Sequence, residues 1–263
     1  MAAQTPSQRR LANALISLKS LQDRGLTVLR TNELSRDDRE SLVDAGFLRP
    51  VIKGWYMPSR PGEFDGGSGG ETTAWYASAN DFIARYCEER FGVQWCVGAD
   101  HSIRLHAGNM ALPAQVVVNA PAGGNSVVKL PAGHSILDYK AKDFPAAGNR
   151  LTVGGLRAMT LEHALVRVSE SFYRTYSRDA QIALLGLKDG GVLVRQLLDG
   201  NHSVIAGRLA GALRACGQDA IADESWDLRL NGAAGADARP VSYYSGIQRA
   251  RAYARGVSAI RLL

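Results

Sequence analysis

The sequence predicts an α+β protein in which N-terminal helices and a hairpin precede a mixed α/β body with a helical C-terminal half. Three observations lead to this fold class: apolar residues at helical spacing near the N-terminus, β-like runs just after them, and a glycine-rich stretch before a second series of strands and helices. The chain has 263 residues, of which 46% are hydrophobic and 21% are charged. This composition is typical of globular proteins, and the length suggests two domains.

The first predicted element is an amphipathic helix over residues 7–23, where leucine and alanine recur at helical spacing. Gly25 ends this helix. A β-like step over residues 27–30 comes next, followed by a short turn that carries Leu34. The beginning of the chain is therefore predicted to be mainly helical, with one short extended segment.

A second predicted helix has recognisable signals at both ends. Ser35 followed by Asp38 resembles a capping box, and the helix that begins there runs to about Ala45. Gly46 occupies the position where a glycine commonly ends a helix. Residues 47–57 then read as two short strands with a turn between them.

Three helical pieces followed by a two-stranded hairpin are the layout of a winged helix-turn-helix. In that module the helix before the hairpin enters the DNA groove, and the hairpin is the wing. Basic side chains on these two elements are therefore the expected contacts to DNA phosphates or bases. They are Arg36, Arg39, Arg49, Lys53 and Arg60.

The charge balance allows a DNA partner without requiring one. The chain carries a net charge of +6, and residues 1–60 contain ten Lys or Arg against six Asp or Glu. The predicted recognition helix is itself acidic, because four carboxylates outnumber its two arginines, so it should bind a groove weakly alone. Those acids are Asp37, Asp38, Glu40 and Asp44. Winged helices also serve as protein-interaction modules, and that interpretation stays open.

The domain organisation follows from the one clear linker. We expect a winged-helix domain over 1–60, a glycine-rich linker over 61–70 and an α/β domain over 71–263. The second domain should contain helices over 72–91 and 100–107, strands over 95–97, 114–119, 126–130 and 134–137, a hairpin over 151–159, helices from Thr160 to Cys216, and a loop-like tail over 226–240.

No motif for catalysis, a cofactor or a metal ion stands out, and we expect a protein that is not an enzyme. Cys87, Cys96, His101 and His106 lack the spacing of zinc ligands. Asp100 could orient His101 as a base, but no matching nucleophile is evident. A third and least favoured interpretation is a metal-dependent nuclease, because Asp138-Tyr-Lys140 matches half of such a pattern.

The cellular setting is predicted to be the cytoplasm. The three cysteines give no disulfide framework, which indicates a reducing compartment. No uncharged run is long enough for a membrane-spanning helix, and the N-terminus lacks the unbroken apolar segment of a secretory signal.

The same residues resemble a known family, the AbiEi-type antitoxins. Its N-terminal winged-helix domain is similar to Leu34 and to the run Leu42-Val-Asp-Ala-Gly-Phe-Leu-Arg-Pro-Val-Ile-Lys-Gly-Trp-Tyr56. Its second domain has a segment order similar to His101-Ser-Ile-Arg-Leu-His-Ala-Gly108, Leu112-Pro-Ala-Gln-Val-Val-Val118 and Leu161-Glu-His-Ala-Leu165. The resemblance covers about residues 10–215, as a pattern without a diagnostic catalytic motif.

This resemblance implies an antitoxin of a bacterial toxin–antitoxin system, often related to phage defence. Such antitoxins bind repeated DNA sites at their own promoter and repress it, while the second domain counteracts a toxin that is commonly a nucleotidyltransferase. Self-association is plausible on physical grounds, because repressors gain affinity by covering adjacent half-sites.

A second resemblance points to an alternative. Three runs are similar to the region that precedes the Fic domain in some long Fic proteins: Gly54-Trp-Tyr-Met-Pro-Ser-Arg-Pro61, Trp75-Tyr-Ala77 and Phe82-Ile-Ala-Arg-Tyr86. The Fic signature itself is absent, so this chain should not transfer AMP. The alternative function is a regulatory or protein-interaction module of a toxin enzyme, either as a free-standing relative or as the front part of a longer protein, with no DNA binding of its own.

Overall fold

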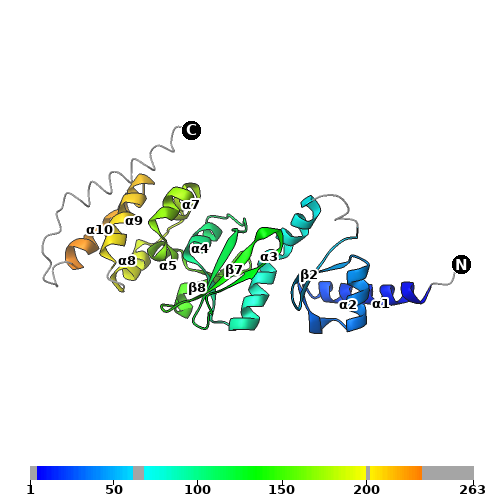
Figure 1. The fold of residues 1–263 in the computed structure, drawn as a ribbon. Coiled ribbons are helices and arrows are strands. Elements are labelled where there is room, and N and C mark those ends of the chain that lie inside the picture. The colour runs from blue at the N-terminus through cyan, green and yellow to red at the C-terminus, as the bar shows by residue number, and fades with distance from the viewer. Residues whose placement is uncertain (1–4, 62–67, 200–201, 233–263) are drawn as a thin grey trace. The chain divides into compact units, whose positions relative to one another are not determined.

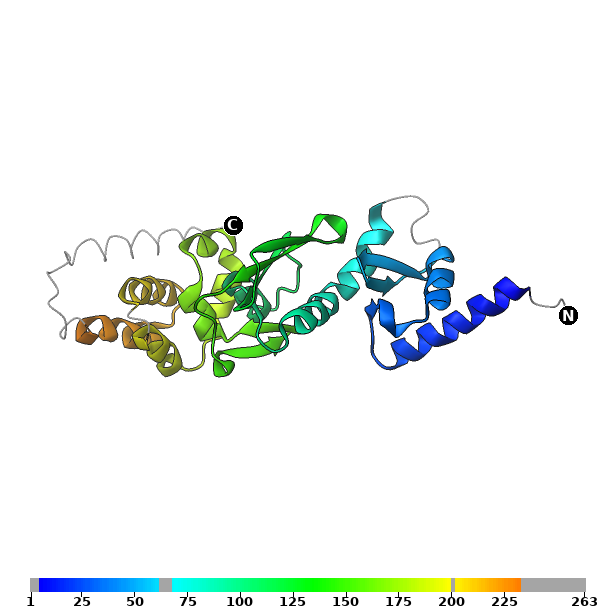
Figure 2. The same ribbon diagram turned by 60° about the horizontal axis from the view of Figure 1, so that its bottom comes forward.

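The protein is described here by a computed structural model that covers residues 5–61, 68–199 and 202–232 (Figures 1 and 2). It is a mixed α+β structure, as the sequence predicts, and it divides into two compact units. The first comprises the described residues of Met1–Trp95, Leu112–Phe144 and Gly154–Leu156. The second comprises those of Cys96–Ala111, Pro145–Val153 and Arg157–Leu263.

Residues 5–61, which we call the head and which are coloured blue in Figure 1, contain helices and a small antiparallel sheet. Their order is α1 (Pro6–Asp23), β1 (Leu29–Arg30), η1 (Thr31–Glu33), α2 (Arg36–Asp44), β2 (Leu48–Ile52) and β3 (Trp55–Pro58). The helices and the hairpin therefore begin and end close to where the sequence predicts them. One apolar core unites them, formed by Ala14, Leu18, Leu21, Leu29, Leu34, Leu42 and Leu48.

The limits of α2 follow from its capping residues. The Ser35 hydroxyl accepts a hydrogen bond from the Asp38 N–H (3.0 Å), which satisfies one free donor of the first turn. At the other end Gly46 adopts a φ of +78°, and the Phe47 N–H bonds the Leu42 carbonyl (2.8 Å). This is a Schellman closure, and it directs the chain from α2 into β2.

The three strands of the head pair in the order β1–β3–β2, and the resulting sheet is apolar on both faces. On one face, Leu48 and Tyr56 pack into the core of the head. On the other face, Trp55 and Met57 are 3% and 2% exposed. Residues two apart on a strand share a face, so α1 and α2 cover only half of this sheet.

Helix α3 (Ser68–Phe91) covers the second face. The rings of Phe82 and Tyr86 contact the Trp55 ring edge-on, with centroids 5.5 and 6.3 Å away. The side of this helix that carries Trp75, Ala79, Phe82 and Ile83 is buried. The helix begins at Ser68, four residues earlier than predicted, so it includes the end of the expected linker. Residues 62–67 lie outside the described residues, and the predicted domain boundaries stay predictions.

The rest of the first unit is a mixed sheet of β5 (Gln115–Ala120), β7 (Ser135–Lys140) and β6 (Ser126–Lys129), with η2 (Pro131–Gly133) before β7. β5 and β7 are parallel, whereas β6 is antiparallel to β7. Two side chains of α3 bond this region: Tyr76 contacts His134 (3.0 Å) and Arg90 contacts Asp138 (2.6 Å). Helix α3 therefore has one side on the head and another on the β5–β7–β6 region.

The second unit is mainly helical. It contains β4 (Cys96–Val97), α4 (Ala99–His106), η3 (Ala147–Asn149), β8 (Arg150–Val153) and all of β9 (Leu156–Met159) except its first residue, followed by α5 (Leu161–Arg167), α6 (Glu170–Thr175), α7 (Ser177–Leu185), α8 (Gly190–Asp199), α9 (Ser203–Ala215) and α10 (Asp219–Gly232). Thr160 caps α5, as predicted, by accepting from the His163 N–H (3.4 Å). Figure 2 shows the same elements after a rotation of 60°.

Two sequence predictions need correction. The tail expected to be loop-like from residue 226 is helical as far as Gly232, because α10 begins at Asp219 and packs along α9 and α8. Its buried residues include the small Ala222 and Ser225, which give no strong apolar pattern. Strand β7 extends to Lys140, three residues beyond the prediction, because Asp138 takes a buried position within it. Residues 233–263, which include the rest of the tail predicted to be loop-like, lie outside the described residues.

Among the described residues, no helix is both long enough and apolar enough to cross a bilayer.

His101 makes the stability of the second unit sensitive to acid. Its ring is 5% exposed, and burial together with the nearby Arg104 charge lowers its pKa from 6.5 to about 4. Between these values the unfolded chain binds a proton that the folded chain excludes, so stability falls as the pH falls. Because of this residue, we expect the free energy of unfolding to decrease by about 3 kcal/mol as the pH is lowered from 6.5 to 4. Urea unfolding of wild type and His101→Gln across that range checks this, and equal pH slopes for the two proteins would contradict it.

Candidate functional site

Three of the predicted phosphate-contacting residues gather at one corner of the head. The Arg39 guanidinium donates to the Thr31 carbonyl (2.9 Å) and lies over the Tyr56 ring, 5.8 Å from its centroid. The Thr31 N–H in turn donates to the Gly54 carbonyl (3.0 Å). Lys53 precedes Gly54, and Arg36 lies one helical turn before Arg39. We call Arg36, Arg39 and Lys53 the basic corner.

A tight turn between β2 and β3 holds Lys53 at this corner. Gly54 adopts a φ of +85°, a conformation that side chains with a Cβ rarely adopt. A Cβ on Gly54 would also come within 3.2 Å of the Arg30 guanidinium. Lys53 itself is exposed at the tip of the turn.

The other two predicted residues lie elsewhere. Arg49 pairs across the strands with Met57 and therefore shares the face of the sheet on which Trp55 and α3 lie. Arg60 follows Ser59, whose N–H and hydroxyl bond the Phe47 and Gly46 carbonyls (3.0 and 2.7 Å) at the C-terminal end of α2. Arg36 is the first residue of α2 and therefore lies at the opposite end, about 14 Å along the helix axis from the C-terminal end that Ser59 contacts. The five predicted residues thus divide into the basic corner and two separate positions.

The acidic residues of α2 differ in what they do. Asp38 is half-buried and accepts a hydrogen bond from the Ser17 hydroxyl of α1 (3.1 Å), so it contributes to the contact between α1 and α2. Glu40 forms an ion pair with Arg36 (2.7 Å). The Glu40 side chain is 56% exposed and the Arg36 side chain is 80% exposed. The hydrogen bond and charge of Arg36 lower the pKa of Glu40, and the same contact raises the pKa of Arg36. Because exposed pairs of this kind contribute little free energy, a phosphate can compete for Arg36.

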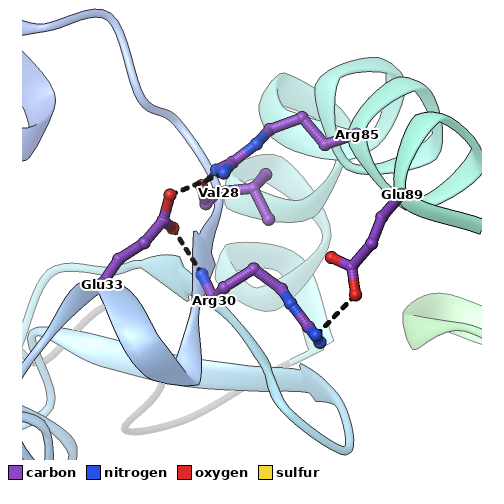
Figure 3. A network of polar contacts seen from close by, with 5 residues as sticks. All are labelled: Val28, Arg30, Glu33, Arg85 and Glu89. Atoms are coloured by element: carbon purple, nitrogen blue, oxygen red, sulfur yellow. Dashed lines mark hydrogen bonds and ion pairs between the residues drawn. The ribbon is translucent and has the colours of Figure 1, made fainter. Parts of the chain in front are cut away.

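A polar network joins β1, η1 and the residue before β1 to α3 (Figure 3). Arg85 of α3 donates to the Val28 carbonyl and to the Glu33 carboxylate, the latter at 2.7 Å. The other oxygen of Glu33 accepts from the Arg30 N–H (2.6 Å). Burial alone would raise the pKa of Glu33, but the hydrogen bonds from Arg85 and from the Arg30 N–H outweigh it and lower the pKa.

Two further contacts extend this network along α3. The Arg30 guanidinium pairs with Glu89 (2.5 Å), and the Thr27 hydroxyl donates to Asp81 (2.5 Å). Asp81, Arg85 and Glu89 are four residues apart and therefore lie along one stripe of the helix. Sequence reasoning missed these residues. Their four-residue spacing of alternating charges can be read from the sequence, but the same spacing is typical of helix faces that are exposed to solvent, so it does not predict a contact with the head.

Both arginines of the network lie over the Trp55 ring. The guanidinium carbons of Arg30 and Arg85 lie 4.8 and 5.7 Å from its ring centroid. With Phe82 and Tyr86 at its edges, the ring is almost completely buried. Trp55 therefore packs inside the first unit and is not available to stack on a nucleic-acid base.

Asp138, which carried the nuclease interpretation, is engaged by other protein groups. Its carboxylate accepts from the Ser126 N–H and hydroxyl and pairs with Arg90. Burial alone would raise its pKa, but the Ser126 hydrogen bonds and the Arg90 charge outweigh this effect and lower it. Lys140 is exposed at the end of β7. This arrangement indicates that Asp138 holds the start of β6 and the end of α3 together.

The thiols of Cys87 and Cys96 are both buried, and burial raises both pKa values. Across the described ranges, no group of three or more His, Cys, Asp or Glu residues is arranged to hold a metal ion. The polar features that stand out in the first unit are thus the basic corner, the network behind it and the cluster around Asp138.

Comparison with known proteins finds no match: no protein-family model, no curated protein and no solved structure matches the chain.

Asp138→Ala is expected to destabilise the first unit, because it leaves the Ser126 donors and the Arg90 charge without their shared partner. The expected loss is about 2 kcal/mol of unfolding free energy. Urea denaturation at neutral pH measures it, with Lys140→Ala as the matched control on the same strand. Equal unfolding midpoints for the two variants would contradict this structural role of Asp138.

Proposed function

We propose that the head is a winged helix-turn-helix that binds DNA and that the protein is an antitoxin-like transcription regulator of a bacterial toxin–antitoxin system. In this assignment α2 is the recognition helix, the β2–β3 hairpin is the wing, and the chain represses its own promoter. The element order of the head and the resemblance of its sequence to AbiEi-type antitoxins support this proposal.

One observation carries the proposal: hydrogen bonds connect the start of α2, η1 and the wing turn into one basic corner. Arg39 bonds Thr31, and Thr31 bonds Gly54, so the turn that presents Lys53 is linked to the recognition helix. A helix and a wing that contact the same duplex need this fixed relation. Arg36, Arg39 and Lys53 are then the primary contacts to phosphates or bases, while Arg49 and Arg60 are secondary contacts.

The remaining parts of the proposal rest on the resemblance. We propose that the body counteracts a cognate toxin and that the protein self-associates on repeated DNA sites, in the cytoplasm and without cofactor or catalysis. Self-association would raise the affinity of a head whose α2 surface is not strongly basic.

Lys53→Ala and Arg36→Ala test the basic corner. Each is expected to weaken binding to every duplex and to lower the slope of log affinity against log salt by about one, because one fewer phosphate contact releases one fewer counterion. Fluorescence anisotropy at several salt concentrations measures this on a duplex from upstream of the gene and on a scrambled duplex.

Lys188→Ala, which removes an exposed charge between α7 and α8, is the matched control and should retain the wild-type slope. If all three variants keep that slope, the corner does not contact DNA and the assignment is wrong.

A second candidate function is a protein-interaction module that regulates a toxin enzyme, and the outer face of α2 favours it. Asp37, Glu40 and Asp44 are all exposed, and their spacing places them along one side of the helix. Such a surface complements a basic protein and repels a phosphate backbone.

The neighbouring gene product is the partner to test for this function. Co-expression with a tagged copy of it should recover a stable complex without DNA. A D37N/E40Q/D44N variant should weaken that complex by about tenfold or more. Unchanged recovery with this variant would exclude the acidic face as the contact surface.

A further inference from the structure

We propose that Arg85 of α3 is a positioning residue for the basic corner, so that the DNA-reading module extends from the head through α3. This inference rests on the proposed function and adds to it a residue outside the expected winged-helix domain. The contacts of Arg85 are with Val28, Glu33 and Trp55. It acts through β1 and η1, the segment on which the corner is built.

The path from Arg85 to the corner consists of consecutive hydrogen bonds. Arg85 donates to the Glu33 carboxylate, which accepts the Arg30 N–H and so closes η1. The first residue of η1, Thr31, donates its N–H to Gly54 in the wing turn and accepts from Arg39 of α2. A shift of η1 therefore moves the wing turn and the recognition helix relative to each other.

The contacts of Arg85 are stronger than those of an ordinary surface arginine. Its side chain is 28% exposed and that of Glu33 is 23% exposed, so the pair is partly removed from water. Its second contact is to the carbonyl of Val28, the fully buried residue that directly precedes β1. A planar guanidinium can bond two such acceptors at once, which a lysine does less well.

A second set of contacts also fixes the wing turn against α3. Trp55 begins β3 immediately after the wing turn, and the guanidiniums of Arg85 and Arg30 both lie over its ring. Arg30 is itself held by Glu89 of α3. Two segments that hold the wing turn are thus fixed against one helix: η1, which hydrogen-bonds the turn through Thr31, and β3, which follows the turn.

The test uses full-length Arg85→Ala and Arg85→Lys, with Arg174→Ala as the matched control. Arg174 is 74% exposed in the second unit, and its replacement removes the same charge from a weak pair with Glu170. Circular dichroism and stoichiometric titration establish the folded, active fraction, so that affinities refer to folded protein only.

A positioning role has a specific signature. Arg85→Ala should weaken binding to the upstream duplex by about tenfold, change binding to a scrambled duplex by less than about twofold, and leave the salt slope unchanged, because no phosphate contact is lost. Arg85→Lys should recover part of the preference for the upstream duplex. Unaltered affinity in Arg85→Ala, or a salt slope lowered by one, would overturn the proposal.

Amide hydrogen exchange separates this proposal from the proposed function. If the wild-type chain shows no preference for the upstream duplex, the proposed function fails, while exchange at the Thr31 N–H still reports on the corner. Arg85→Ala should then speed that exchange by about tenfold relative to Arg174→Ala. Equal rates in the two variants would overturn the positioning role independently of DNA.

Discussion

The head depends on a sheet that is apolar on both faces but has helices of its own on only one. Trp55 and Met57 would be exposed if α1 and α2 were their only neighbours, and removing such large side chains from water is among the strongest terms in folding. Helix α3 resolves this by placing Phe82 and Tyr86 against Trp55. The head is consequently packed as part of the first unit, although a linker was expected just before this helix.

Around the contact between the head and α3, each of the two elements contributes one arginine and one carboxylate. The head contributes Arg30 and Glu33, and α3 contributes Glu89 and Arg85, so each arginine pairs with a carboxylate of the other element. Two guanidiniums can therefore approach one indole ring without uncompensated repulsion. The same pairing makes the orientation specific, because rotating the head on α3 would separate both pairs and leave partly buried charges without partners.

Local signals in the sequence predicted most of the elements but few of their partners. The spacing of leucines predicted α1, Ser35 and Gly46 predicted the two ends of α2, and Thr160 predicted the start of α5. The contacts of Arg85 with Val28 and Glu33 join residues more than fifty positions apart, which no periodicity reports. The predicted strand stopped at residue 137 because a carboxylate is not expected at a core position. In the fold, Arg90 and Ser126 lie beside Asp138 and compensate for its burial. Helix α10 escaped prediction because Ala222 and Ser225, on its buried side, are small.

The most direct test of this account is an electrophoretic mobility shift with the full chain on the DNA upstream of its own gene, at near-physiological salt. A basic corner held in a fixed geometry should give a specific complex at sub-micromolar protein, and a scrambled duplex in excess should not displace it. Absence of a shift, or equal displacement by any duplex, would contradict the account and favour a protein partner for the head.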